Sequence, residues 1–168
     1  MEFRETDTLH FFSYETKISM DLLAGWQEES QSKDTAVYYV DVSEVPAGVD
    51  APSSNPRILV KAIAVGNSTA DNHIKLADAI LNDSLANVTV IEREEGTLDS
   101  QPAVFDLFTF DMDGTRTTQY MAHAQISDVV FSIVCTVEEA YAEVLLPSMQ
   151  LGVASARFIL IAGGGVQS

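Results

Sequence analysis

The chain has 168 residues, of which 46% are apolar, so it is long enough to bury one sizeable core in a single domain. Its formal net charge is −16, from 25 acidic residues against nine lysines and arginines. This charge repels a phosphate backbone and excludes nucleic acid as an expected partner. A membrane-spanning helix is not predicted either, because no run approaches about eighteen uninterrupted apolar residues.

The first third of the chain predicts strands around one long loop. The first residues, MEFRETDTLHFF, are acidic where a signal peptide needs a basic segment and an apolar core, so we expect a cytoplasmic protein. Polar and apolar residues alternate at 17–22, which predicts a half-buried strand, and further strands are expected at 35–42 and 58–65. Residues 43–56 hold three prolines and several turn formers, which predicts an exposed loop.

The middle of the chain predicts a helix and then a hairpin. Apolar residues recur at helical spacing from 70 to 85, as in an amphipathic helix. Further on, Asp113-Gly114 separates two extended segments, 103–110 and 115–125. This dipeptide supplies the positive φ angles of a type I′ turn, so the two segments are expected to pair.

Two more strands, at 87–93 and 128–135, flank this hairpin in the sequence. After the second of them, residues 136–139 (TVEE) have the form of a capping box, which predicts that the last helix begins there. Pro147 lacks a backbone donor and clashes with the preceding turn, so it is expected to kink or break that helix. The glycine-rich residues 163–168 are expected to form a flexible tail.

These elements predict an α+β fold with a mainly antiparallel sheet and helices packed on it, built by residues 1–162 as one domain. One strand carries apolar residues on both faces, since Phe105 and Leu107 alternate with Phe108 and Phe110. Such a strand belongs to a sheet that is covered on both sides or that exposes an apolar face to a partner.

The apolar periodicity also predicts which side chains form the core. Cys135 is the single cysteine, so no internal disulfide can form, and its apolar run predicts a small buried thiol. The side chains expected to be largely buried are Trp26, Val60, Ile63, Leu81, Phe105, Leu107, Phe131, Ile133 and Leu145.

Residues 110–115, FDMDGT, resemble the first motif of haloacid-dehalogenase phosphatases, in which a strand ends in two aspartates. Asp111 would then attack phosphorus and Asp113 would act as general acid and base. That motif is followed by a long crossover helix, whereas another extended segment follows here, and no lysine occurs after Lys75. A hairpin turn is the favoured interpretation, and a metal-dependent phosphohydrolase is the alternative.

No catalytic, cofactor-binding or metal-binding residue is predicted, and the chain is not expected to be an enzyme. His10, His73 and His123 lie on three separate elements, and none has a second histidine or cysteine at a ligand spacing. Each is expected to be an ordinary surface or partly buried histidine.

The order of elements and several short motifs match a known family pattern. Residues 18–26, ISMDLLAGW, resemble the opening strand followed by proline-x-glycine-tryptophan of the PsbP-like superfamily, although Leu23 stands where the proline is usual. Residues 101–103 (QPA), Gly114 and residues 146–148 (LPS) fall where that family has a strand start, a hairpin glycine and a helix proline. These positions are structural, so the resemblance transfers no site residue.

The resemblance implies a PsbP-like α/β/α sandwich and a non-enzymatic protein, since the superfamily includes Ran-binding Mog proteins, DcrB-type proteins and chaperones for type VI secretion effectors. We therefore expect a chaperone, adaptor or assembly factor. It would bind a protein partner, such as an apolar segment of a cargo protein, through an apolar sheet face or the 43–56 loop. The alternatives are a phosphohydrolase that uses Asp111 and Asp113, and a structural subunit that buries its apolar face in a homodimer.

Overall fold

The structure, a computed structural model, describes residues 2–11, 14–22, 26–31, 35–40, 56–65, 70–83, 85–126 and 129–162. Before residue 56 the description covers the backbone and the side chain of Met20. The predicted tail at 163–168, the predicted loop except Pro56, and the side chain of Trp26 lie outside the described residues.

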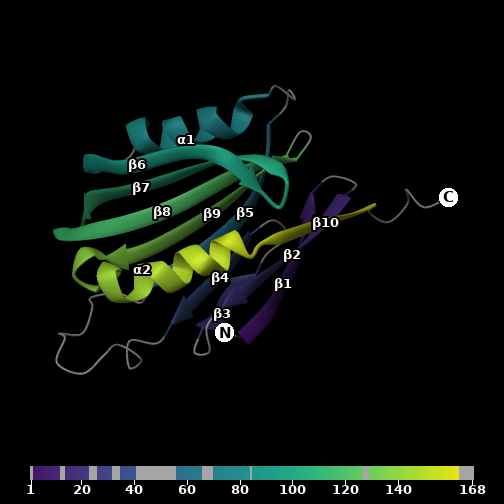
Figure 1. Cartoon of the computed structure of the whole chain (residues 1–168), viewed down its shortest axis with the longest axis horizontal. Coiled ribbons are helices and arrows are strands. Elements are labelled where there is room, and N and C mark those ends of the chain that lie inside the picture. Colours follow the sequence, from purple (N-terminus) through teal and green to yellow (C-terminus); the bar gives the residue numbers. More distant parts are fainter. Residues whose placement is uncertain are drawn as a thin grey trace.

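The described elements are β1 (Glu2–Phe11), β2 (Tyr14–Leu22), β3 (Trp26–Gln31), β4 (Thr35–Val40), β5 (Arg57–Ala64), α1 (Asn72–Asp83), β6 (Ala86–Leu98), β7 (Gln101–Met112), β8 (Thr115–Ile126), β9 (Val129–Glu138), α2 (Glu139–Ala154) and β10 (Arg157–Ala162). They form a seven-stranded sheet in the order β3-β4-β5-β9-β8-β7-β6 and a three-stranded sheet in the order β1-β2-β10 (Figure 1). All pairings between described strands are antiparallel.

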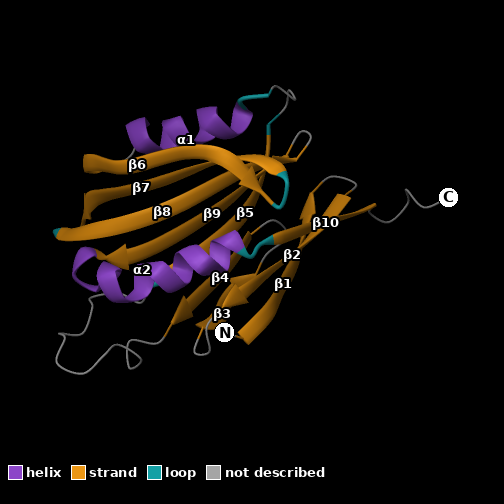
Figure 2. Cartoon of the chain, viewed as in Figure 1, coloured by secondary structure: helices purple, strands orange, loops and turns teal. Residues whose placement is uncertain are grey.

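The two helices lie on opposite faces of the seven-stranded sheet (Figure 2). Helix α1 packs on β7 and β8, and helix α2 packs on β8, β9 and the neighbouring β2. Each face of the sheet therefore buries apolar side chains against a helix. The predicted α+β fold with an antiparallel sheet is confirmed.

Two tight turns join β6, β7 and β8 into a meander. Asp99 and Ser100 have φ angles of 47° and 66°, and Asp113 and Gly114 have φ angles of 51° and 81°. Positive φ at both central residues is typical of the type I′ turns that match the twist of a hairpin. The predicted Asp113-Gly114 hairpin is confirmed.

The α2 face carries the larger core. Phe131 and Phe158 lie with their ring centroids 5.2 Å apart, and Ile133 and Met149 are fully buried beside them. Met20, at the end of β2, is also fully buried in this cluster and links the smaller sheet to it.

The α1 face carries a second core. Ala77 of α1 packs with Val104, Phe108 and Met121, and all four side chains are fully buried. This cluster explains why the helical periodicity at 70–85 predicted α1 correctly, since the apolar residues of the helix face the sheet.

Arg93 of β6 ties α1 to the sheet through an ion cluster. Its Nε and Nη2 donate to the Asp106 carboxylate at 2.6 and 3.2 Å, and its Nη1 donates to Asp78 of α1 at 2.6 Å. Asp106 is fully buried. Hydrogen bonding to Asp106, more than to Asp78, raises the pKa of Arg93 above its ordinary value. The buried carboxylate therefore has its compensating charge in Arg93.

The predicted core was correct for some of its side chains and wrong for others. Val60, Phe131 and Ile133 are buried, and the buried Cys135 thiol has a pKa that burial raises to about 12. The predicted core side chains that are only half-buried are Ile63, Leu81, Phe105, Leu107 and Leu145. For Phe105 and Leu107 the reason is that α2 packs on β8 and β9 and leaves the β7 part of that face open.

The predicted capping box does not form. Strand β9 continues to Glu138, which has extended φ and ψ of −60° and 141° and makes no side-chain cap bond. Thr136 is paired with Gln119 in the sheet, and its hydroxyl donates to the Gln119 side chain at 3.3 Å, so it is not at a helix start. Pro147 does not break α2 either, because the helix continues from Glu139 to Ala154.

The strands β1, β3 and β10 were not predicted. Their segments pair with β2 or β4 in the two sheets, with β10 running beside residues far earlier in the chain. The pairing of β10 with β2 is a long-range contact, which leaves a weak signal in the local sequence, whereas β1 and β3 each pair with the next strand along the chain.

Candidate functional site

The FDMDGT motif forms part of the β7–β8 hairpin. The Asp111 carboxylate accepts hydrogen bonds from Asn87 Nδ2 at 2.6 Å and from Arg116 Nη1 at 3.1 Å. These bonds, first from Asn87 and then from Arg116, lower the pKa of Asp111. Strand β8 follows the turn directly, without the crossover helix of the phosphatase motif. Asp111 thus joins β6 to β8, and Asp113 supplies a turn conformation.

Arg116 extends this network across the open end of the sheet. Its Nη2 donates to the hydroxyls of Thr89 and Thr109 at 3.0 and 2.7 Å, and its Nε lies 3.9 Å from the Glu139 carboxylate. The guanidinium therefore joins three strands and the start of α2.

His123 is more buried than the sequence predicted. It is fully buried on β8, with Nε2 3.0 Å from the Ser132 hydroxyl and with Nδ1 lacking a hydrogen-bond partner. His73 is also buried, and Oε1 of Gln125 accepts from its backbone amide at 3.1 Å and lies 2.9 Å from its Nδ1. The side chain of His10 lies outside the described residues. Among the residues described, no group of three or more His, Cys, Asp or Glu could hold a metal.

We expect His123 to make the protein less stable as the pH is lowered. Burial, followed by the charges of His73 and Arg93, lowers the pKa of His123 to about 4, below the value of about 6.5 in an unfolded chain. The unfolded state binds the extra proton between these values, so stability is retained above about pH 6.5 and lost as the pH falls toward 4. Between pH 7 and pH 4, the free energy of unfolding of the wild type should fall by up to about 3 kcal/mol more than that of His123→Phe. Urea unfolding from pH 7 to pH 4 measures this difference.

The matched control is Ser132→Ala, which removes the hydrogen bond to His123 and keeps the titrating ring. This substitution should lower the free energy of unfolding at every pH, and the dependence of that free energy on pH should stay as in the wild type. Equal slopes in the wild type and in His123→Phe would show that His123 does not titrate in this range.

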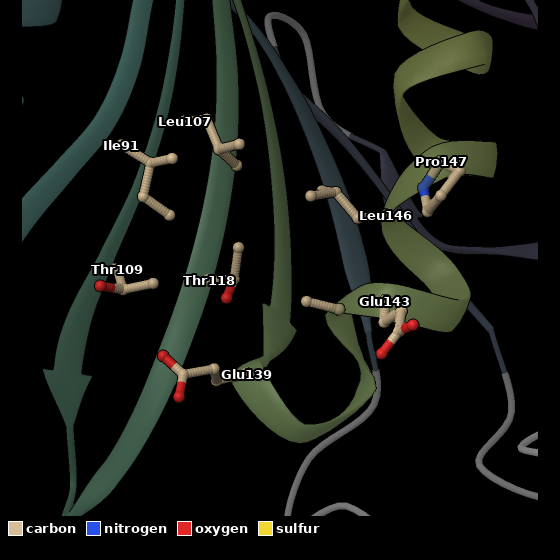
Figure 3. A pocket seen from close by; sticks show the side chains of 9 residues that line it. Ile91, Leu107, Thr109, Thr118, Glu139, Glu143, Leu146 and Pro147 are labelled. Atoms are coloured by element: carbon tan, nitrogen blue, oxygen red, sulfur yellow. The ribbon is translucent and has the colours of Figure 1, made fainter.

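The open part of the α2 face holds a groove between α2 and strands β6 to β8 (Figure 3). We call it the α2 groove. Leu146 points from the helix toward the strands that carry Leu107 and Thr118, and Glu139 and Glu143 lie at one end. Its volume is about 390 Å³. The lining residues are Ile91, Leu107, Thr109, Thr118, Glu139, Ala142, Glu143, Leu146 and Pro147.

Two smaller hollows continue the groove along the sheet, with volumes of about 90 and 290 Å³. Both contain Glu94, Phe105 and Tyr120, and the smaller one shares Leu107 with the α2 groove. We call this continuation the aromatic end of the groove. Its remaining lining residues are Glu92, Thr97, Leu98, Asp99, Gln150 and Ala154.

The sheet register explains why these side chains gather. Glu92 lies opposite Leu107, and Glu94 lies opposite Phe105, so both glutamates extend from β6 on the same face. A register shift between Val90 and Glu92 accompanies the exposed position of Ile91 at the groove.

Helix α2 is apolar on the face it buries and also on the face it exposes. Tyr141 and Met149 are buried, whereas Val144 and Leu151 are 50% and 57% exposed and Pro147 is exposed between them. Positions 144, 147 and 151 form one stripe at helical spacing. An exposed stripe beside an apolar groove is typical of a protein-interaction surface.

Apolar, threonine, tyrosine, glutamine and carboxylate side chains line the groove and its aromatic end, and this lining holds neither a cysteine nor a histidine. Neither of the two described helices is both long enough and apolar enough to cross a membrane.

Comparison with solved structures shows that the chain shares its fold with LpqN, Mog1p and PsbP, as the resemblance implied. LpqN of Mycobacterium tuberculosis, involved in cell envelope biogenesis, is 12% identical with a TM-score of 0.64 over 93% of this chain and 91% of its own. The Saccharomyces cerevisiae Ran-binding protein Mog1p is 11% identical, with a TM-score of 0.57 over 93% and 96%. PsbP of the cyanobacterium Synechocystis is 12% identical, with a TM-score of 0.50 over 82% and 94%.

The sequence itself matches no protein-family model, and a search of curated proteins found no relative. The likeness therefore concerns the fold.

Sequence reasoning foresaw an apolar sheet face with Phe105 and Leu107 and missed the contribution of α2. The spacing of Val144, Pro147 and Leu151 was a readable signal for a second apolar stripe. The position of Ile91 was not readable, because it depends on an irregularity in the pairing of β6 with β7.

Proposed function

We propose that this protein is a non-catalytic binding domain that acts as a chaperone or adaptor and holds a protein partner on α2 and in the α2 groove. The observation that carries the proposal is the apolar stripe of Val144, Pro147 and Leu151 on the outward face of a helix whose inner face is already buried. An exposed apolar stripe on a helix whose opposite face is already buried is typical of an interaction surface, and here a partner would cover the stripe.

The groove beside the stripe supports the same proposal. Ile91 is 57% exposed and Leu107 and Leu146 are half-buried, so a partner segment in the groove would remove their apolar surface from water. Mog1p, which has the same fold, is a Ran-binding protein, and this supports a role in binding another protein.

The test compares two double variants in affinity purification from native cells, followed by titration calorimetry with the purified partner. Val144→Gln/Leu151→Gln should weaken binding at least about tenfold, because it would bury two amides at the interface in place of apolar side chains. The matched control is Val90→Gln/Met112→Gln, in which the replaced side chains are 50% and 40% exposed on β6 and β7.

The control double variant should retain the partner. The proposal would be refuted if no partner were recovered, or if every recovered partner bound both double variants equally well. A stable dimer of the purified wild type that dissociates in Val144→Gln/Leu151→Gln would favour the self-associating subunit instead.

A further inference from the structure

The aromatic end of the α2 groove combines two aromatic rings with two carboxylates. Phe105 and Tyr120 lie stacked, with ring centroids 6.4 Å apart and an interplanar angle of 18°. Both are half-buried, so their rings form part of the floor and still reach solvent. Glu92 and Glu94 line the same hollow from β6 and are exposed.

Two other acidic side chains that line the groove lie near an arginine, since Glu139 has Arg116 at 3.9 Å and Asp99 has Arg157 at 3.9 Å. The arginine of β6, Arg93, is bound to Asp78 and Asp106. Within the described parts of the chain, neither Glu92 nor Glu94 forms an ion pair.

The pKa of Tyr120 reflects the negative charge of Glu92 and Glu94 beside it. Burial, and then the charges of Cys135, Glu94 and Glu92, raise the pKa of Tyr120 to about 12. The phenol therefore stays neutral at physiological pH, and its ring lies in a region of negative potential. A cation is attracted both by an aromatic face and by adjacent carboxylates.

We propose that the aromatic end binds an arginine or lysine side chain of the partner segment, while an apolar side chain of the same segment occupies the groove between Ile91, Leu107 and Leu146. This inference rests on the proposed function and specifies its partner as a basic amphipathic segment. A second copy of this chain fits less well, because each copy carries a net charge of −16 and the groove is itself acidic.

The groove also sets the spacing of the two side chains. Ala142 and Leu146 line its apolar part, Gln150 and Ala154 line its aromatic end, and these four residues recur every fourth position along α2. Four helical residues span about 6 Å. A helical partner segment lying along α2 would therefore present its apolar and basic side chains about one turn apart, as an i, i+4 pair.

The experiment uses two capped helical peptides of about fifteen residues, each with a leucine stripe and one arginine. In one peptide the arginine lies four residues before a leucine, and in the other it lies four residues after a leucine. Each has a matched peptide in which citrulline replaces arginine, which keeps the shape and removes the charge. Fluorescence anisotropy with the full chain in about 0.15 M salt, where long-range attraction is screened, measures the dissociation constants. We expect at least one arginine peptide to bind about tenfold more tightly than its citrulline counterpart.

The matched protein variants are Glu94→Gln and Glu95→Gln. These neighbours point to opposite faces of β6, since Glu94 pairs with Phe105 of the groove and Glu95 pairs with Val104 of the α1 core. Each substitution removes one negative charge, so nonspecific attraction changes equally. The preference for arginine should fall to within about threefold in Glu94→Gln and persist in Glu95→Gln.

Arginine and citrulline peptides that bind the wild type equally would overturn the inference and leave apolar binding in the groove intact. Loss of the preference in Glu95→Gln as much as in Glu94→Gln would also overturn it, because the attraction would then be nonspecific. Absence of binding by every peptide at millimolar concentration would overturn it as well. The α2 variants of the proposed function test that function separately.

Discussion

Replacing Arg93 with leucine is expected to destabilise the protein by about 3–5 kcal/mol, because it leaves the Asp106 carboxylate buried without its partner. Asp106 is fully buried and receives two hydrogen bonds from Arg93, at 2.6 and 3.2 Å. The same substitution also frees α1 from its bond to the sheet through Asp78. The free energy of unfolding in urea, followed by circular dichroism, measures the loss.

Two companion variants show whether the buried charge is the cause. Arg93→Leu/Asp106→Leu removes both charges and should recover most of the loss, since an apolar pair in place of a buried ion pair is often neutral. Lys75→Leu removes an exposed cation that lies 3.4 Å from Asp71, and it should cost less than about 1 kcal/mol. If Arg93→Leu cost no more than Lys75→Leu, the cluster would be of no more consequence than a surface ion pair.

Truncating Phe131 to alanine is the second large expected loss, about 3–5 kcal/mol. The side chain is 1% exposed, and its ring centroid lies 5.2 Å from that of Phe158 at the start of β10. The substitution removes a large apolar side chain and leaves a cavity between the sheet and the segment that follows α2. The measurement is again urea unfolding, with the slope of the transition compared to confirm that the unfolded state is unchanged.

The control for Phe131→Ala is Val90→Ala on the exposed side of β6, which should change stability by no more than about 0.5 kcal/mol. Phe131→Leu should fall between the two, because it fills part of the cavity. Equal stability of Phe131→Ala and wild type would mean that the core collapses around the site.

The candidate site shows which kinds of inference sequence supports. Alternation of Phe105 and Leu107 with Phe108 predicted that both faces of this strand are apolar, and α1 and α2 do lie on opposite faces. The sequence could not show whether a helix covers the face of β7 that carries Phe105, because this depends on where α2 lies across the sheet. The helix packs on β8 and β9, and so β7 is left at the floor of an open groove.

His123 and the capping box are cases in which the local sequence predicted the wrong environment. His123 was expected to be a surface or partly buried residue, yet it is fully buried, because its strand lies third from the β6 edge of the sheet, where α1 covers it. Thr136 was expected to start a helix, and pairing with Gln119 holds it in β9 instead. In both cases contacts with residues distant in sequence override the local pattern.

Local chemistry was sufficient for the Asp113-Gly114 turn and for helix α1. The Asp113-Gly114 dipeptide favours positive φ whatever surrounds it, and the spacing of apolar residues at 70–85 places one face of α1 against a core. The same local chemistry placed the aspartates of FDMDGT in a hairpin, as the structure has them. The groove and its acidic aromatic end came from packing, because each combines side chains of strands and a helix that only long-range contacts bring together.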